Sequence, residues 1–166
     1  MSNKTLKKPN DETASARSRK HPLGLWLGAA LLLFGLLAVY SGVSSLLDNK
    51  TRLIAPRGVL TVEVVDTPEL RRQGLSDRQS LGNNEGMLFD FEQSSSQHCI
   101  WMKDMQFPLD IIWADENKQV VYIEQNVKPD TYPDSFCPDS VARYVLEINA
   151  GRSSEIGIEV GTTLRF

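Results

Sequence analysis

Three charged side chains interrupt stretches that otherwise have the composition of apolar β-strands. Lys103 follows Trp101 in "QHCIWMKDMQFPLD", Asp110 stands where the next apolar run begins, and Glu147 lies inside "YVLEI". Burying a charge costs free energy unless the charge is paired or hydrogen-bonded. We therefore expect Lys103, Asp110 and Glu147 to meet one another or to line a cleft.

Three interpretations of these residues are open. In the first, the charges form an ion-paired cluster that fixes the register of the strands. In the second, they line a ligand-binding cleft floored by Trp101, in which Lys103 holds an anionic or hydroxylated group. In the third, Asp110 and Glu147 form an acid–base pair, which requires a suitable distance between the carboxyl groups. The candidate ligand-binding residues are thus Trp101, Lys103, Asp110 and Glu147, and no residue is assigned as catalytic.

Short strands separated by turns have to position these side chains. Leu60, Val62 and Val64 alternate with polar residues, which is the period of a half-buried strand. Further strands are expected at residues 87–91, 109–114, 119–127, 143–148 and 162–166, and short helices at 68–73 and 151–156. The pattern predicts a mostly β fold, a compact β-sandwich or small barrel-like domain with one or two short helices.

A long apolar segment precedes this domain. Residues 23–43 carry no charge, and as a helix these 21 residues span roughly 31 Å, close to the hydrocarbon core of a bilayer. Six Lys and Arg residues precede the segment and three follow it closely, which favours a cytoplasmic N-terminus. A cleaved signal peptide or a buried soluble helix is the alternative.

The preferred interpretation is a single-pass protein of the inner (cytoplasmic) membrane, anchored through Leu23 to Val43. We predict a basic cytoplasmic tail (1–22), a transmembrane helix (23–43), a linker (44–57) and a periplasmic or extracellular β-rich domain (58–166). Residues 48–166 hold 12 basic and 19 acidic side chains, a net charge of −7. This acidity argues against nucleic acid as a partner.

Cys99 and Cys137 are the only cysteines of the chain. Two thiols outside the cytoplasm are read most simply as one disulfide, which would hold a proline-rich loop over Trp101. The alternative is a reactive thiol beside His98, but neighbouring residues on a strand point to opposite faces. His98 is the only histidine of the predicted exported part, so the usual His and Cys metal-site spacings are absent. We expect neither a metal nor another cofactor.

Several fragments resemble one known family. "VEVVDTPELRRQGLSDR", "GMLFDF", "WMKDMQFPLDIIW" and "ARYVLEINAGRSSEIGIEVG" follow the order and spacing of the Domain of Unknown Function 192 (DUF192) family across residues 59–161. The resemblance implies a compact β-rich fold in a prokaryotic envelope protein and brings no established activity. Asp104-Met105 replace an expected Asn-Thr, and Thr162 replaces a commoner acid, so any chemistry of that Asn-Thr pair is in doubt here.

The leading functional hypothesis is a non-enzymatic envelope module that binds a small ligand, an envelope polymer or a protein partner. The alternatives are an envelope hydrolase of polysaccharide or peptide that uses Asp110 and Glu147, and a structural or assembly factor. If the protein is an enzyme, we expect a concave site with two titratable groups within hydrogen-bond reach of each other. A binding module predicts an aromatic-lined pocket without such a pair.

Overall fold

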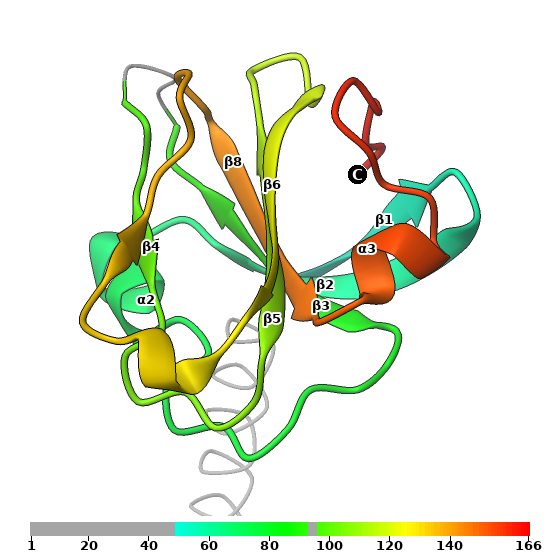
Figure 1. Ribbon diagram of the computed structural model, residues 1–166. Coiled ribbons are helices and arrows are strands. Elements are labelled where there is room, and N and C mark those ends of the chain that lie inside the picture. The colour runs from blue at the N-terminus through cyan, green and yellow to red at the C-terminus, as the bar shows by residue number, and fades with distance from the viewer. Residues whose placement is uncertain (1–48, 93–95) are drawn as a thin grey trace, which may run out of the picture. The chain divides into compact units, whose positions relative to one another are not determined.

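The described part of the chain folds around a six-stranded, mixed β-sheet (Figure 1). The computed structural model describes residues 49–92 and 96–166. The strands lie in the order β1 (Lys50–Ala55), β2 (Gly58–Val65), β3 (Glu85–Asp90), β8 (Tyr144–Asn149), β5 (Leu109–Ala114) and β6 (Val120–Val127). The β2–β3 pair is parallel, and the other neighbouring pairs are antiparallel. Strand β8 is therefore an interior strand with a hydrogen-bonded neighbour on each side.

Smaller elements cover parts of the sheet. They are the two-stranded ribbon of β4 (Ile100–Trp101) and β7 (Ser135–Phe136), the helices α2 (Pro68–Gln73) and α3 (Arg152–Glu155), and the 3-10 turn η1 (Pro129–Thr131). In Figure 1, α2 and β4 lie together on one side of the domain, and α3 lies near β1 and β2 on the other. The expectation of a mostly β fold with short helices is confirmed.

Helix α2 begins and ends as its sequence predicts. The Thr67 hydroxyl caps the helix by accepting a hydrogen bond from the Leu70 N–H at 3.3 Å, and Pro68 occupies the first turn, where its missing N–H costs nothing. The helix ends at Gly74, whose φ of +51° is a conformation that favours glycine. Helix α2 thus forms the connection between the parallel strands β2 and β3.

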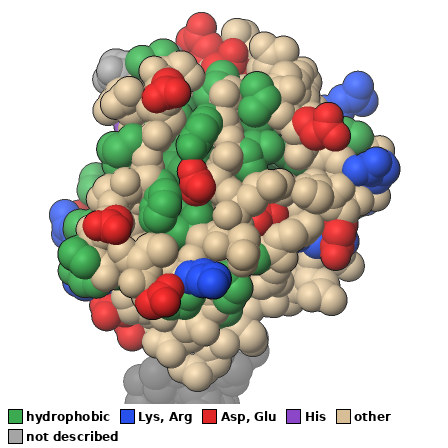
Figure 2. Space-filling model, viewed as in Figure 1, with side chains coloured by type: hydrophobic (Ala, Val, Ile, Leu, Met, Phe, Trp, Pro, Cys, Tyr) green, Lys and Arg blue, Asp and Glu red, His purple; other side chains and the backbone are tan. Residues whose placement is uncertain are grey.

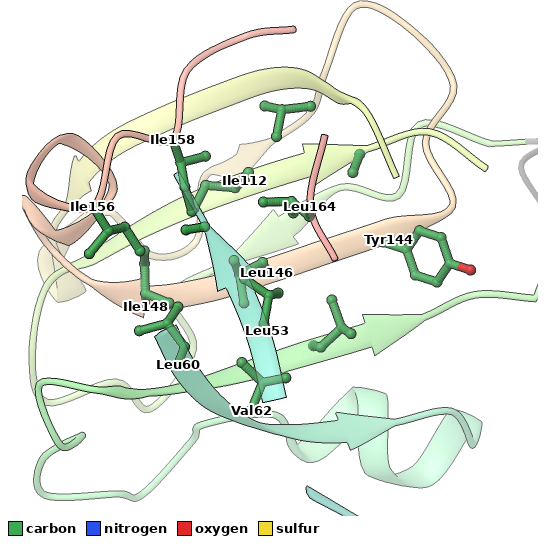
Figure 3. Packing of buried hydrophobic residues seen from close by; sticks show 14 residues of the cluster. Leu53, Leu60, Val62, Ile112, Tyr144, Leu146, Ile148, Ile156, Ile158 and Leu164 are labelled. Carbon is green, nitrogen blue, oxygen red and sulfur yellow. The ribbon is translucent and has the colours of Figure 1, made fainter. Parts of the chain in front are cut away.

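Each face of the sheet packs against its own hydrophobic core. Strand β8 alternates, so that Leu146 and Ile148 face the first core while Val145 and Glu147 face the second. The first core is shown in Figure 3, where Ile156, Ile158 and Leu164 from the C-terminal segment pack over sheet residues. The second core lies between the sheet, the segment that joins β4 to β5, and Leu75 after α2. Its buried members are Val65, Leu75, Met87, Phe89, Ile100, Met102, Met105, Leu109, Ile111, Trp113, Val127, Ala142 and Val145.

Two predicted segments differ from the structure. Residues 44–57 were expected to form a linker, but Lys50–Ala55 are strand β1, paired with β2 along its whole length. Leu53 and Ala55 are buried on that strand and belong to the first core. The mostly polar composition of the segment suggested a linker, but its alternating apolar residues pack against the sheet. Residues 162–166 do not form a strand, because Thr163 and Arg165 make only isolated bridges to two different edges.

The predicted membrane anchor at residues 23–43 falls outside the described residues. No helix within residues 49–92 or 96–166 has both the length and the apolar character needed to cross a bilayer.

Candidate functional site

A pocket of about 380 Å³ opens on the face of the sheet that carries the second core. Its wall comes from α2 and the residues after it on one side and from the segment around β4 on the other. The lining residues include three cations, three aromatic side chains and one carboxyl group: Arg71, Arg72 and Lys103; Phe89, Phe91 and Trp101; and Glu147. A volume of this size accommodates a small organic molecule.

Glu147 is the buried acidic group of this pocket. It is only 5% exposed, and no residue of the described ranges hydrogen-bonds its carboxyl group. Its neighbours across the sheet are Met87 on β3 and Ile111 on β5, which are both apolar. Burial raises the pKa of Glu147 from 4.5 to about 8, and the positive charge of Arg78 opposes that rise only in part. The side chain is therefore mostly a neutral carboxylic acid at pH 7.

Arg71 is held in place at the wall of the pocket. Its Nη1 donates hydrogen bonds to the backbone carbonyl oxygens of Asp66 and Asp90, the latter at 2.8 Å, and its guanidinium lies 5.1 Å from the centre of the Phe91 ring. These contacts use one edge of the guanidinium. Nε and Nη2 have no hydrogen-bond partner in the described part of the chain, so they are left for a ligand.

Arg72 and Lys103 complete the positive lining. Arg72 is exposed and has no ion pair or hydrogen bond with another described residue. Lys103 lies 4.0 Å from the Asp104 carboxylate, and both side chains are more than half exposed. A pair this long and this exposed contributes little stability. Both cations can therefore turn toward a negatively charged group in the pocket.

Aromatic rings form the apolar part of the wall. Trp101 is 51% exposed, and its ring lies in an edge-to-face arrangement with Tyr132, with 6.2 Å between the ring centres. It therefore lies at the rim of the pocket, whereas the sequence analysis expected it at the floor. Phe89 is buried, and Phe91 stacks on His98 at 3.7 Å. Gly74 lies against Phe89, and a Cβ at this glycine would come within 3.4 Å of that ring.

A disulfide between Cys99 and Cys137 fixes the ribbon that carries Trp101. The predicted bridge is present, with a Cα–Cα distance of 4.3 Å, and it joins the residues flanking β4 and β7. Trp101 pairs with Ser135 across the ribbon. The proline-rich segment is therefore held beside Trp101, as the sequence predicted. Cys99 itself lines the pocket.

Removing this bridge with the double substitution Cys99→Ala/Cys137→Ala is expected to lower the free energy of unfolding by about 2–4 kcal/mol, because the unfolded chain loses a constraint on a long loop. Urea unfolding followed by circular dichroism measures the change. The single-site variant Val160→Ala, at an exposed position outside the pocket, is the control. Equal unfolding midpoints for wild type and the double variant would show that the ribbon is held without the bridge.

Asp110 does not belong to the pocket. It pairs with Ile148 across the sheet and so faces the first core, whereas Glu147 pairs with Ile111 and faces the second. The two carboxyl groups lie on opposite faces of the sheet, and the predicted acid–base pair between them is wrong. An ion-paired cluster of Lys103, Asp110 and Glu147 is wrong for the same reason. Trp101, Lys103 and Glu147 do line one pocket.

Asp110 instead binds backbone N–H groups. Its Oδ1 accepts hydrogen bonds from the N–H of Asn126 and of Gly151, each at 3.0 Å. Its Oδ2 accepts from the N–H of Ser153 at 3.0 Å and from the Ser153 hydroxyl at 2.7 Å. Asp110 is 0% exposed; its two bonds with Ser153 are buried, and those with Asn126 and Gly151 are partly buried. The residue ties the end of β6 and the start of α3 to the sheet.

Arg71 and Arg72 line the pocket but were not among the residues predicted from the sequence. Consecutive arginines in the last turn of a short helix are read first as partners of the helix dipole. The signal that could have found them is their position in the last turn of α2, one residue before Gln73-Gly74 ends the helix.

The lining brings together groups that can bind a ligand. Glu147 is the only carboxyl group among the residues that line this pocket. Within residues 49–92 and 96–166, no cluster of three or more His, Cys, Asp or Glu side chains is arranged to hold a metal ion. The arrangement supplies a hydrogen bond from a neutral acid, stacking or edge contacts from aromatic rings, and three positive charges.

Comparison with known proteins places the domain in a family. The DUF192 family model, described as "Uncharacterized ACR", matches residues 52–166. A crystal structure from Sinorhizobium meliloti 1021, described as a candidate transcription regulator, is 33% identical with a TM-score of 0.64 and covers 70% of this chain and 91% of its own. A protein of unknown function from Novosphingobium aromaticivorans DSM 12444 is 27% identical with a TM-score of 0.65, covering 70% and 85%. The curated proteins contain no match. The chain belongs to the DUF192 family.

Proposed function

We propose that this protein is a membrane-anchored, extracytoplasmic module of the cell envelope that binds a small ligand in the pocket beneath α2 and β4. One observation carries the proposal: Glu147, a buried carboxyl group that no described residue hydrogen-bonds, lines a pocket that is open to solvent. A polar group in that position costs stability unless something outside the chain uses it. Small-molecule sites typically combine such a group with apolar and aromatic walls.

The envelope location rests on the sequence and on the disulfide. The uncharged segment 23–43 has the length of a membrane helix, and the basic residues before it favour a cytoplasmic N-terminus. A disulfide within the domain supports an oxidising compartment. These observations favour a periplasmic or extracellular position for the β-rich domain.

Binding is a better proposal than catalysis or nucleic-acid recognition. Glu147 is the only carboxyl group among the residues that line the pocket, whereas the hydrolase hypothesis requires Asp110 beside it. The Sinorhizobium protein is described as a regulator of transcription, but residues 48–166 of this chain carry a net charge of −7, which repels a phosphate backbone. Figure 2 shows acidic side chains spread over the face of the domain that carries β5 and β6. An assembly factor would need no pocket of this kind.

Differential scanning calorimetry of the full-length protein in detergent tests the proposal. The probes are neutral sugars, acidic sugars, short peptides, aromatic acids and phosphate esters. A ligand at about 100 times its Kd stabilises by about 2.7 kcal/mol, which raises Tm by roughly 5–10 °C for a domain of this size. We expect at least one probe class to produce such a shift.

Trp101→Ala is expected to weaken binding of that probe by about tenfold, because a half-exposed ring at the rim is lost while the core stays intact. Val160→Ala, which alters an exposed apolar side chain outside the pocket, should bind as wild type does. If no probe changes Tm, the binding function is refuted. If Trp101→Ala and wild type respond alike to a bound probe, the pocket is not its site.

A further inference from the structure

The charges that line the pocket point to the class of its ligand. Arg71, Arg72 and Lys103 contribute three positive charges, and Glu147 is the only acid in the lining. This local excess of positive charge occurs although residues 48–166 together carry a net charge of −7. A positive cleft in an acidic domain attracts a negatively charged small molecule and concentrates it at the site.

We propose that the pocket binds a small organic anion, with the acidic group beside Arg71 and Arg72 and an uncharged ring against Trp101 and Phe89. The inner end of the ligand carries a hydroxyl or carbonyl group that hydrogen-bonds Glu147. This inference rests on the binding function proposed above and names the ligand class of the same site.

The geometry of Arg71 supports an acidic ligand group. Its Nη1 is already bound to two backbone carbonyl oxygens and its face packs on Phe91, so the guanidinium does not need to be ordered when a ligand arrives. Nε and Nη2 remain unused by the described residues, and together they form the two-donor edge that binds a carboxylate or phosphate through two parallel hydrogen bonds. Arg72, the next residue on the same helix, adds a second charge.

Glu147 suits the inner end of such a ligand in its neutral form. Met87 and Ile111 face it from the neighbouring strands, and both are apolar. The charged groups on this side of the sheet are Arg78, which acts on Glu147 electrostatically and is ion-paired with Glu63 at 2.7 Å, and the cations of the lining on α2 and beside β4. A neutral carboxylic acid donates a hydrogen bond to a ligand oxygen and does not repel the ligand's negative charge.

Ionisation of Glu147 should oppose an anion. Since burial raises the pKa of Glu147 to about 8, the acid is neutral below that pH and charged above it. A negative charge inside the pocket repels a negative ligand, so we expect affinity for the anion to fall severalfold between pH 7 and pH 9.

Four probes that share one phenyl ring separate the ligand classes. They are 4-hydroxyphenylacetate, phenyl phosphate, the neutral 4-hydroxyphenylacetamide and the cationic tyramine. Isothermal titration calorimetry with the full-length protein in detergent should show binding of the carboxylate or the phosphate, at least tenfold tighter than the amide or the amine. Glucuronate and glucose extend the same comparison to sugars.

Three variants assign the contacts. Arg72→Ala should weaken the anions by about tenfold and leave the amide unchanged, whereas Arg52→Ala, which removes an exposed arginine on β1 outside the pocket, should change neither. Glu147→Gln keeps a hydrogen-bond donor and the side-chain shape, so it should bind the anions within about threefold of wild type at pH 7. Its affinity for the anions should also stay constant between pH 7 and pH 9, where that of wild type falls.

The outcomes separate this inference from the function on which it rests. If the amide binds as tightly as the acids and Arg72→Ala has no effect, while Trp101→Ala weakens both, the pocket binds ligands but the anion assignment is wrong. Preferential binding of tyramine would make Glu147 the partner of a cation and would overturn the assignment as well. If neither acid binds, the assignment is also overturned, and the wider panel of probes then decides the binding function.

Discussion

The wild-type protein is expected to lose stability as pH rises from about 5 to 9, and replacing Glu147 by glutamine should prevent most of that loss. Burial raises the pKa of Glu147 from 4.5 to about 8 in the folded protein, whereas the unfolded chain titrates near the ordinary value. Between these two values the folded state keeps a proton that the unfolded state releases. The free energy of unfolding is therefore highest below pH 4.5, falls as pH rises through about 8, and then levels off.

The effect is large because the two pKa values lie far apart. Each unit of difference corresponds to about 1.4 kcal/mol, so this one side chain accounts for a loss of about 3–5 kcal/mol at pH 9. A domain of this size has a total stability of only about 5–15 kcal/mol. Glutamine has nearly the same shape and carries no ionisable group, so the variant should match wild type at pH 5 and exceed it in stability at pH 9.

Urea unfolding of wild type and Glu147→Gln at pH 5, 7 and 9 measures this difference. Glu159→Gln is the matched control, because Glu159 is exposed and its carboxyl group binds no other described residue. The control should follow the wild-type curve at every pH. A wild-type protein that is as stable at pH 9 as at pH 5, measured against the control, would mean that the Glu147 carboxyl is solvated when it ionises.

This cost gives Glu147 its functional interest. The sheet could place an apolar residue at this interior position of β8, where both cross-strand neighbours are apolar. A side chain that lowers stability and has no partner within the described chain contradicts the local pattern, and such conflicts concentrate at functional sites. The same carboxyl group therefore links the stability prediction to the proposed ligand pocket.

The sequence predicted local features well because they depend on neighbouring residues. Alternation along "YVLEI" placed Glu147 on the face opposite Leu146 and Ile148, and the structure agrees. The limits of α2 followed from Thr67, Pro68 and Gly74. The disulfide was predicted because the chain has only two cysteines and both lie in the part predicted to be exported.

The composition of the site depended on strand register, which the sequence does not contain. Nothing in the chain indicates that β5 pairs with β8 so that Ile111, and not Asp110, lies opposite Glu147. A shift of one residue would move Asp110 to the other face of the sheet. Arg71 and Arg72 were missed for a related reason: α2 lies over this face only because β2 and β3 are parallel and need a crossover between them.

Replacing Asp110 by alanine is expected to destabilise the protein by about 4–5 kcal/mol at pH 7. The substitution removes the shared acceptor of the N–H groups of Asn126, Gly151 and Ser153. The Ser153 N–H is buried and the other two bonds are partly buried, while Asp110 itself is 0% exposed. Each unsatisfied buried donor costs about 1–3 kcal/mol. Asp110→Asn should be nearly as destabilising, because whichever way the amide turns, its NH₂ group faces N–H donors.

Asp115→Ala is the control that separates burial from the number of hydrogen bonds. Asp115 also accepts two backbone N–H bonds, from Asn117 at 2.9 Å and Gln119 at 2.8 Å, but in an exposed hairpin where water can replace it. We expect a loss of about 1 kcal/mol or less for Asp115→Ala in urea unfolding. Equal losses for the two alanine variants would show that the N–H groups around Asp110 find other partners.

Ligand binding then distinguishes a structural role of Asp110 from a catalytic or binding role. Asp110 faces the first core, on the side of the sheet opposite to the pocket. The fraction of Asp110→Ala that is folded at low temperature should therefore bind a pocket ligand with wild-type affinity, although it unfolds at a much lower urea concentration. A loss of affinity in fully folded Asp110→Ala protein would contradict this separation. It would mean that a shift of β5 also displaces β8 and, with it, Glu147.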